Sequence, residues 1–433
     1  KMLEKVYRLY EEAKNEWRWI YNKKKDGAKT PADHVTLAKW CATEDLFEEA
    51  LEQYDEALKK DPEMVAARTG LEKLRKALEI PVFAQMHKVV KEPLKNAVTT
   101  LLSQQAPDGS FGADIVEAGV HGKLGMSCLV GLALIASWEF ETLEDIDNAR
   151  EAPVALTKLI TWVLTNTEKG KSLRGPDVWG EIYCLEFLAK CLKKAGLGDQ
   201  KEGIQNRARK ALEELKRLMR SDGGWAYYDP PLVTGGITFV TACAIVAMMD
   251  AKEAGLPFDA DMVGKACGMI QKLRQKPGLF LYREGSRAEG DVGPAGRSSL
   301  CEYALLRAGA TQDTGGLAVA VENFFRHRHI LEKLKGAPQT HSTKMGDGQT
   351  APYYYLFGHY WTTRAIKKMP KDKQLPLLQK MWSEFASSQE ADGSFWDWPL
   401  AKTANSNRIY GTALGILCLY QHALEDRMSL LPK

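Results

Sequence analysis

The sequence lacks an apolar stretch long enough to cross a membrane. Its longest uncharged apolar run, residues 124–138, is shorter than the ~20 residues that a spanning helix needs, so we expect a buried helix there. No signal peptide is visible at the start either. Because the chain opens inside a helical pattern, we expect it to be part of a longer one, which leaves its compartment and its possible export open.

Closely paired cysteines are also missing. None of the eight cysteines forms a Cys-x-x-Cys pair, and most lie within apolar helical runs. We therefore expect free, buried thiols, as is typical of a reducing, cytoplasm-like compartment, with disulfides and metal clusters as the alternatives. These cysteines are Cys41, Cys128, Cys184, Cys191, Cys243, Cys267, Cys301 and Cys418.

An excess of charge of either sign is absent as well. The 433 residues include 59 basic and 56 acidic side chains, for a net charge of +3. Whole-chain electrostatics thus predict no nucleic-acid partner. Hydrophobic residues make up 45% and charged residues 27%, a composition typical of a soluble globular protein.

Internal repetition is the main positive signal. Residues 105–111 read Gln-Ala-Pro-Asp-Gly-Ser-Phe, and residues 389–395 read Gln-Glu-Ala-Asp-Gly-Ser-Phe. Degenerate copies occur at 221–225 and 276–280. Each copy combines a glycine turn with an aromatic residue, which indicates a repeated helix–turn–helix unit.

Small-residue apolar helices follow these turns and alternate with amphipathic ones. The alternation predicts helices enclosed on all sides and helices with one wet face. We therefore expect an all-α fold, an (α/α)6 toroid of six helical hairpins over residues 82–433, whose repeats run to about residue 424. The six enclosed helices begin near Gly125, Gly180, Thr238, Gly296, Gly358 and Tyr410.

The first 81 residues are expected to form a short helical arm. From Pro31 onward this arm resembles one tetratricopeptide repeat, which ends at Pro62. A single repeat cannot bury both of its faces, so we interpret it as a brace or adaptor, with a peptide-binding groove as the alternative. The matching small and aromatic positions are Leu37, Ala38, Ala50, Tyr54 and Ala57.

The glycine turns of the longer region resemble the repeats shared by squalene and oxidosqualene cyclases and protein prenyltransferase beta subunits. Met219 and Arg274 replace the glutamine in the two degenerate copies. In such a turn the glutamine bonds to backbone groups at a helix end and the aromatic packs beneath. We therefore interpret Asp108, Asp222 and Asp392 as turn residues rather than catalytic acids.

The chemistry that the resemblance implies is not matched by the residues. Triterpene cyclases of this family use an Asp-x-Asp-Asp acid, whereas residues 145–148, the nearest string, read Asp-Ile-Asp-Asn. The prenyltransferases hold zinc on an Asp-x-Cys pair and a histidine. Here His359 resembles that histidine, but Cys301 lies about one turn too deep and no Asp-x-Cys is present. We expect no cofactor, with zinc as the alternative.

In a ring of this kind, the loops that lead into the inner helices meet at one mouth of a central cavity, so we place the ligand site there. Arg297, His359, Tyr360 and Arg408 are the strongest candidates, because a charge or an imidazole inside a ring needs a partner or a ligand. Tyr227, Tyr282, Tyr353 and other aromatics of the adjoining turns join them. The candidate set is His121, Trp179, Glu181, Arg297, His359, Tyr360, Arg364, Arg408 and Tyr410.

Three functions fit this expectation, and whether the protein is an enzyme stays open. The main hypothesis is a terpene-cyclase- or prenyltransferase-like toroid that binds an apolar or isoprenoid ligand without cyclase activity. The first alternative is a non-catalytic scaffold with a protein partner. The second is a polysaccharide lyase-like enzyme, in which His359, Tyr360 and Arg364 would transfer the proton and neutralise a carboxylate.

Overall fold

The computed structural model describes two compact units, Lys1–Val89 (unit 1) and Val90–Lys433 (unit 2). The sequence pattern had suggested a boundary near residue 81. The described residues are 19–43, 46–112, 119–144, 151–165, 178–194, 200–227, 235–286, 290–336, 343–345, 348–351, 353–397 and 404–423.

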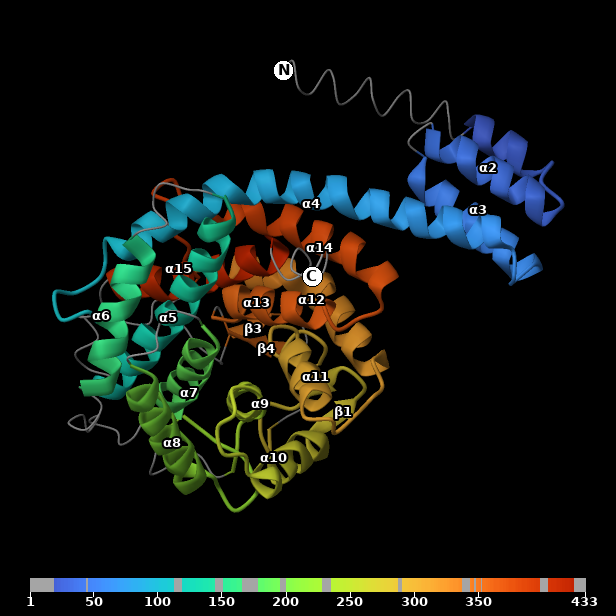
Figure 1. Ribbon diagram of the computed structural model, residues 1–433. Coiled ribbons are helices and arrows are strands. Elements are labelled where there is room, and N and C mark those ends of the chain that lie inside the picture. The colour runs from blue at the N-terminus through green and yellow to red at the C-terminus, as the bar shows by residue number, and fades with distance from the viewer. Residues whose placement is uncertain are drawn as a thin grey trace. The chain divides into compact units, whose positions relative to one another are not determined.

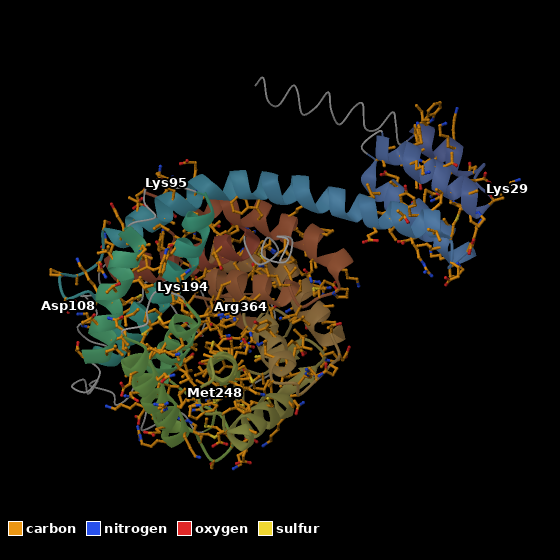
Figure 2. The ribbon with its side chains drawn as sticks, in the orientation of Figure 1. Lys29, Lys95, Asp108, Lys194, Met248 and Arg364 are labelled. Carbon is orange, nitrogen blue, oxygen red and sulfur yellow. The ribbon has the colours of Figure 1, made fainter. Side chains whose placement is uncertain are left out.

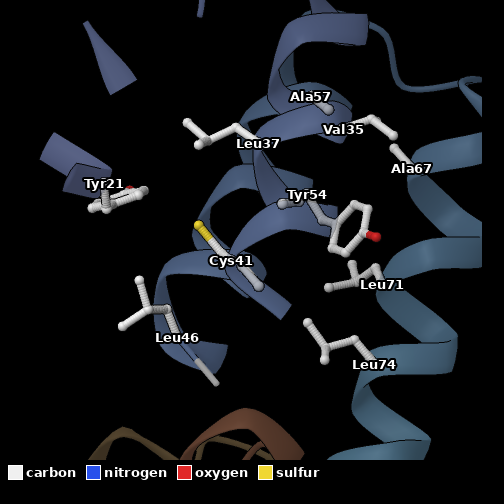
Figure 3. Close-up of a cluster of buried hydrophobic side chains, with 12 residues drawn as sticks. Tyr21, Val35, Leu37, Cys41, Leu46, Tyr54, Ala57, Ala67, Leu71 and Leu74 are labelled. Atoms are coloured by element: carbon white, nitrogen blue, oxygen red, sulfur yellow. The ribbon is translucent and has the colours of Figure 1, made fainter. Parts of the chain in front are cut away.

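Unit 1 is built from short helices around an apolar core. Helix α2 (Pro31–Thr43) packs against α3 (Phe47–Lys60), and the first part of α4 (Val65–Leu102) completes the core. Figure 3 shows Leu37 of α2 and Tyr54 of α3 in this cluster. All five positions that matched the tetratricopeptide pattern are buried.

Unit 2 consists of two concentric sets of helices. The inner helices are α5 (Gly119–Glu144), α7 (Val178–Lys193), α9 (Thr238–Glu253), α11 (Ser298–Arg307), α13 (Tyr354–Ile366) and α15 (Ala404–Ala423). The outer helices are the last part of α4, α6 (Glu151–Thr165), α8 (Lys201–Leu218), α10 (Ala260–Lys272), α12 (Gly315–Lys333) and α14 (Lys371–Phe385).

The inner helices form a closed ring. Each packs against the next one along the chain, and α15 returns to pack against α5 (Figure 1). The fold is therefore an (α/α)6 toroid, as the sequence predicted. Inner helices α9 and α13 are buried along nearly their whole length, whereas α8 and α10 bury one face. No helix in the described ranges combines the length and apolar character needed to cross a bilayer.

Glycine turns join four of the hairpins to the next outer helix. Gly109, Gly223, Gly278 and Gly393 all have positive φ, which only glycine adopts without strain. An added Cβ at Gly109 would lie 2.7 Å from the carbonyl oxygen of Lys158 in α6, the next outer helix. The other three turns make the equivalent close approach to α10, α12 and α4. Because the last turn reaches the first outer helix of the ring, the same contact that joins the repeats also closes the ring.

The turn glutamines strengthen this contact. The Gln105 amide donates to the carbonyl oxygens of Gly109 at 3.0 Å and of Ala155 in α6 at 2.9 Å. The Gln389 amide donates to Gly393 at 2.9 Å and to Pro93 in α4 at 2.8 Å. Each glutamine therefore ties its own turn to the neighbouring outer helix, which confirms the predicted role.

The turn aspartates accept hydrogen bonds from the backbone two residues on. Asp108 accepts from the amide of Ser110, Asp222 from Gly224 and Asp392 from Ser394, each at 3.0 Å. Their interpretation as turn residues is thus confirmed.

Short strands complete the outer-to-inner connections. Strand β1 (Arg274–Lys276) pairs antiparallel with β2 (Leu279–Phe280), and β3 (Thr343–Met345) pairs with β4 (Gly348–Thr350). A 3₁₀ turn, η3 (Ala386–Ser388), follows α14. The strands precede α11 and α13, so they lie at the face where the inner helices begin.

Replacement of Gly393 by alanine tests the closing contact. The new Cβ would lie 2.8 Å from the Asn96 carbonyl oxygen at a φ of +82°. The left-handed backbone alone costs about 1–2 kcal/mol, so we expect the clash to lower the free energy of unfolding further. Gly255→Ala is the matched control, because Gly255 has a φ of +77° and nothing within 4 Å of an added Cβ. Equal losses for the two variants in urea unfolding would contradict a role for the close approach.

Candidate ligand-binding site at the rim of the ring

All inner helices begin at one face of unit 2, because inner and outer helices alternate in direction along the chain. We call this the rim face. The outer-to-inner connections, which include the glycine turns and the strands, gather there. The inner helix N-termini at this face carry partial positive charge. Two of their N–H groups are capped by the connections: Val178 donates to the Tyr227 carbonyl oxygen at 3.1 Å and Thr238 to the Tyr282 carbonyl oxygen at 3.0 Å.

Three tyrosines from three different connections meet at the rim face. Tyr227 follows α8, Tyr282 follows β2 and Tyr353 precedes α13; we call them the rim tyrosines. The hydroxyls of Tyr227 and Tyr282 are 2.6 Å apart. All three rings are partly exposed, and their centroids lie 5.9 to 6.3 Å from the ring of buried Phe239. They therefore form an aromatic platform with polar edges.

Tyr227 and Tyr353 keep their protons at neutral pH. Burial raises the pKa of Tyr227 well above its ordinary value, and the neighbouring Tyr282 and Tyr354 raise it further. Burial likewise raises the pKa of Tyr353, together with the charge interaction with Tyr227. These hydroxyls therefore donate and accept hydrogen bonds, whereas a general base would need a lowered pKa.

Arg297 supports the platform from below. It precedes α11, is 1% exposed, and donates to the carbonyl oxygens of Gly293 at 2.7 Å and Phe280 at 3.2 Å. Its guanidinium also lies over the rings of Tyr282 and Tyr354, at 5.6 and 5.8 Å from their centroids. Of the charged residues predicted from sequence, Arg297 is the one that the structure brings to the rim tyrosines.

Aromatic rings line the ring interior below the platform. Trp179 stacks on Tyr183 at 5.5 Å and packs against Phe239 at 5.9 Å. Phe357 bridges Phe239 and Trp361, at 5.7 and 6.1 Å. Phe239, Phe357 and Trp361 are almost completely buried. Predicted residue Trp179 therefore joins the platform to this packed interior.

Arg364 and Tyr360 lie deeper, toward the end of α13. The Arg364 guanidinium donates to Glu186 at 3.1 Å, to the Tyr360 hydroxyl at 2.9 Å and to the Tyr303 hydroxyl at 3.3 Å. Asp250 lies 4.0 Å away. Figure 2 shows Arg364 inside the ring. This buried charge network thus joins α7, α9, α11 and α13 at the end remote from the rim, whereas the sequence analysis had assigned both residues to the mouth.

The network continues outward through Arg307. Its guanidinium pairs with Asp250 at 2.8 Å and with Glu253 at 2.6 Å, and Lys193 pairs with Glu253 at 2.9 Å. Burial favours a raised pKa for Asp250, but the surrounding cations outweigh it and lower the pKa. Burial raises the pKa of Glu186, although the charge of Arg364 opposes this. Sequence reasoning missed Glu186 and Asp250; their signal was a carboxylate inside an apolar helix.

Two candidate residues, Glu181 and His359, lie between the inner and outer helices and do not face the mouth of the ring. Glu181 pairs with Arg207 of α8 at 3.0 Å. His359 is fully buried, donates through Nδ1 to the Tyr355 carbonyl oxygen at 2.7 Å and accepts through Nε2 from Arg328 at 3.2 Å. Because a carbonyl only accepts and a guanidinium only donates, this geometry fixes a neutral imidazole.

Zinc ligands do not gather around His359. Its ring packs against Phe324 and Phe385 of the outer helices, at 5.0 and 5.2 Å. Cys301 instead interacts with Thr238 of α9, and burial raises the pKa of its thiol to about 12. Within the described ranges, no three His, Cys, Asp or Glu side chains are grouped as metal ligands. All eight cysteines are buried and free, as predicted.

The remaining candidates belong to the first helix and the last helix of the inner ring. Arg408 pairs with Asp392 of the last glycine turn and donates to the Ser394 hydroxyl at 2.9 Å. Tyr410 is partly buried, and both burial and the nearby Asp397 carboxylate raise its pKa. His121 lies in α5, but its side chain is outside the described residues.

Comparison with known proteins supports the fold. The sequence matches no protein-family model and no curated protein. The cellobiose 2-epimerase of Spirochaeta thermophila DSM 6192 has a TM-score of 0.55 at 13% identity, over 81% of this chain and 99% of that one. The cellobiose 2-epimerase of Bacillus thermoamylovorans B4167 has a TM-score of 0.49 at 12% identity, over 76% and 98%. For the GH76A α-1,6-mannanase of Salegentibacter sp. HEL1_6 the values are 0.48 and 12%, over 78% and 98%.

The first of these similarities shows the toroid fold. At 13% identity it shows the fold alone, and it does not support the specific prenyltransferase and cyclase family that the turn motifs resemble. The motif is therefore a marker of the architecture and does not identify the chemistry.

Replacement of Glu186 by glutamine tests the buried network. A carboxyl whose pKa is raised on folding adds stability below its unfolded pKa and loses this contribution as pH rises through the raised value. We expect the free energy of unfolding of the wild type, relative to Glu186→Gln, to fall as pH increases above about 4.5, the ordinary glutamate value. Denaturant titrations at a series of pH values measure this difference.

Glu253→Gln is the control for that experiment. Desolvation favours a raised pKa for Glu253, but Lys193 and Arg307 outweigh it and lower the pKa. Its contribution is present above the unfolded pKa and lost as pH falls, so the trend should have the opposite sign. The same trend for both variants would contradict this assignment.

Proposed function

We propose that unit 2 binds a neutral saccharide at the rim tyrosines. The observation that carries the proposal is the convergence of three partly exposed tyrosines from separate connections, with hydroxyls in hydrogen-bond contact, above buried Phe239. Aromatic faces suit the C–H surfaces of a sugar ring, and neutral phenol hydroxyls suit its hydroxyls.

The charge distribution favours a neutral ligand. Arg297 lies beneath the platform and directs its guanidinium to the carbonyl oxygens of Gly293 and Phe280. It is 1% exposed, so it stiffens the loop that carries the rim residues and offers little surface to an anion. The preorganised rings reduce the entropy that binding costs.

The apolar or isoprenoid ligand expected from the turn motifs has less support. Such a ligand needs exposed apolar surface, whereas Phe239, Phe357 and Trp361 are at most 2% exposed and the partly exposed rings of the rim carry hydroxyls. The Spirochaeta thermophila structure, with a TM-score of 0.55, is an enzyme named for a disaccharide. Both points favour the carbohydrate alternative of the sequence analysis.

The proposal concerns binding rather than lyase chemistry. His359 lies between the inner and outer helices, and Arg364 lies in the deep charge network. Tyr360 bonds to Arg364, and burial raises its pKa well above its ordinary value. These three side chains therefore do not converge on one point at the rim face, as proton abstraction next to a carboxylate would require.

A protein-binding scaffold is the second candidate. Its support is the dense packing of the interior, together with the tetratricopeptide-like helices of unit 1, which are typical of adaptor proteins. A scaffold of this kind would bind no saccharide at the rim.

Variants of Tyr282 test the saccharide proposal. Tyr282→Phe removes the hydroxyl bonded to Tyr227 and should weaken saccharide binding about tenfold, since one hydrogen bond contributes about 0.5–1.5 kcal/mol. Tyr282→Ala also removes the ring face and should weaken binding more. Isothermal titration calorimetry with glucose, mannose, cellobiose and α-1,6-mannobiose measures both effects.

The control is Tyr355→Phe. The Tyr355 hydroxyl bonds to Ser388 inside unit 2, away from the rim tyrosines, so its removal should leave binding unchanged. If no sugar of this set binds to the wild type, or if Tyr282→Ala binds as the wild type does, the proposal is wrong.

A further inference from the structure

An open groove lies at the point where the ring closes. Its walls come from the end of α4, the last glycine turn and the start of α15, all within unit 2, and its volume is about 270 Å³. We call it the seam groove. Its lining residues are Thr100, Leu101, Gln104, Asp392, Arg408, Ile409 and Thr412.

The contacts of the glycine turns identify the residues of other repeats that are structurally equivalent to Thr100, which lines this groove. Gly393 approaches the carbonyl of Asn96 in α4, just as Gly109 approaches that of Lys158 in α6. Thr100 stands four residues after Asn96, so its equivalent in α6 is Trp162. By the same rule, Gly223 and Lys265 make Met269 of α10 the equivalent residue.

Large side chains occupy the equivalent space in those two repeats. Trp162 is 4% exposed and lies under the ammonium of Lys123, 5.4 Å from its ring centroid. The methyl group of Met269 reaches to 3.1 Å from a Cβ built on Gly224. In the β1–β2 repeat the same rule gives Ala320, a smaller residue, and there the buried Glu302 carboxylate of α11 lies beside Gly316. Thr100 is too short to do the same, which leaves the groove open.

The charged pair at the groove is also a repeated feature. Lys123 pairs with the turn aspartate Asp108 at 3.2 Å, and Arg408 pairs with the turn aspartate Asp392. The replacement of lysine by arginine matters, because a guanidinium has five N–H donors and this pair uses Nη1. Among the described residues only Nη1 has partners, so the other donors of Arg408 can serve a ligand at the groove.

The rest of the lining suits a sugar unit. Thr100 donates its hydroxyl proton to the Asp392 carbonyl oxygen at 2.6 Å, which leaves the hydroxyl oxygen able to accept. Gln104 is exposed and makes one long hydrogen bond, at 3.4 Å to Ser103. Leu101 and Ile409 lie beneath these groups and are 1% and 4% exposed, so the accessible lining is mainly polar. Such a lining suits the hydroxyl groups of a sugar.

The seam groove and the rim tyrosines share the rim face. Arg408 and Ile409 line the groove, whereas the next residue, Tyr410, interacts with Cys243 of α9 across the ring interior. Helix α15 therefore lies between the groove and the ring interior. An oligosaccharide that occupies both sites would extend over the start of this helix toward the rim tyrosines.

We propose that the seam groove is a distal subsite for one unit of an oligosaccharide whose other end occupies the rim tyrosines. This inference rests on the proposed function and extends it from a sugar to an oligosaccharide. The ligand would connect the first outer helix to the last inner helix, so its binding would also stabilise the closed ring.

Thr100→Trp tests the inference by restoring the side chain that fills the equivalent space in α6. The probes are two series, glucose to cellohexaose and mannose to α-1,6-mannohexaose, titrated calorimetrically. For the wild type we expect affinity to rise about tenfold or more between the shortest and the longer members of one series. Thr100→Trp should lose this gain and keep the wild-type affinity for the shortest sugar that binds. Thr100→Met, which copies Met269, gives the same test with a smaller side chain.

Thr99→Trp is the matched control, because Thr99 is exposed and does not line the groove. It should retain the full dependence on chain length. If the wild type binds short and long sugars equally, or if Thr100→Trp keeps the rise in affinity with sugar length, the proposed subsite is wrong. Saccharide binding at the rim would not be contradicted by either result. If no sugar of either series binds, the proposed function and the subsite are both wrong.

Discussion

The architecture of unit 2 depends on one contact, the close approach of a glycine turn to the backbone of the next outer helix. At Gly109, Gly223, Gly278 and Gly393 any larger residue would meet a carbonyl group or strain the backbone. In each case the turn of one hairpin contacts the outer helix of the next hairpin. Because the same contact recurs, successive hairpins are arranged in a ring. At Gly393 the successor is α4, and the ring closes without an exposed end.

Closure has consequences for where a ligand can bind. It gathers the connections into the inner helices at a single face, which brings Tyr227, Tyr282 and Tyr353 together although they are far apart in sequence. It also forces the inner helices to bury polar groups, and the structure pairs these with one another. Arg364, Glu186 and Asp250 form such a network at the end remote from the rim. Aromatic rings lie between these two ends. The accessible polar and aromatic surface that we describe for the ring lies at the rim face.

The turn motif explains why the chain resembles one family by sequence although the solved structure with a TM-score of 0.55 shows only a shared fold. The hydrogen bonds of Gln105 and Gln389 all end on backbone carbonyls. A motif that recognises only backbone can join helices in any ring of this type, whatever reaction the ring supports. Differences between the repeats therefore indicate a binding site better than the shared motif does. Thr100 stands where other hairpins have Trp162 or Met269, and the smaller side chain leaves the seam groove open.

The sequence alone determined the helical hairpins, their alternation between buried and half-exposed, the roles of the turn glutamines and aspartates, and the free cysteines. These follow from local periodicity and from short-range backbone bonding, both of which are visible along the chain. The direction that each polar side chain faces was decided by tertiary structure. An inner helix such as α13 is buried on every side, so its periodicity does not distinguish the ring interior from the contact with outer helices. His359 turned outward to Arg328, whereas Arg364 turned inward to Glu186, 178 residues away in sequence, because only the assembled ring supplied each with its partner.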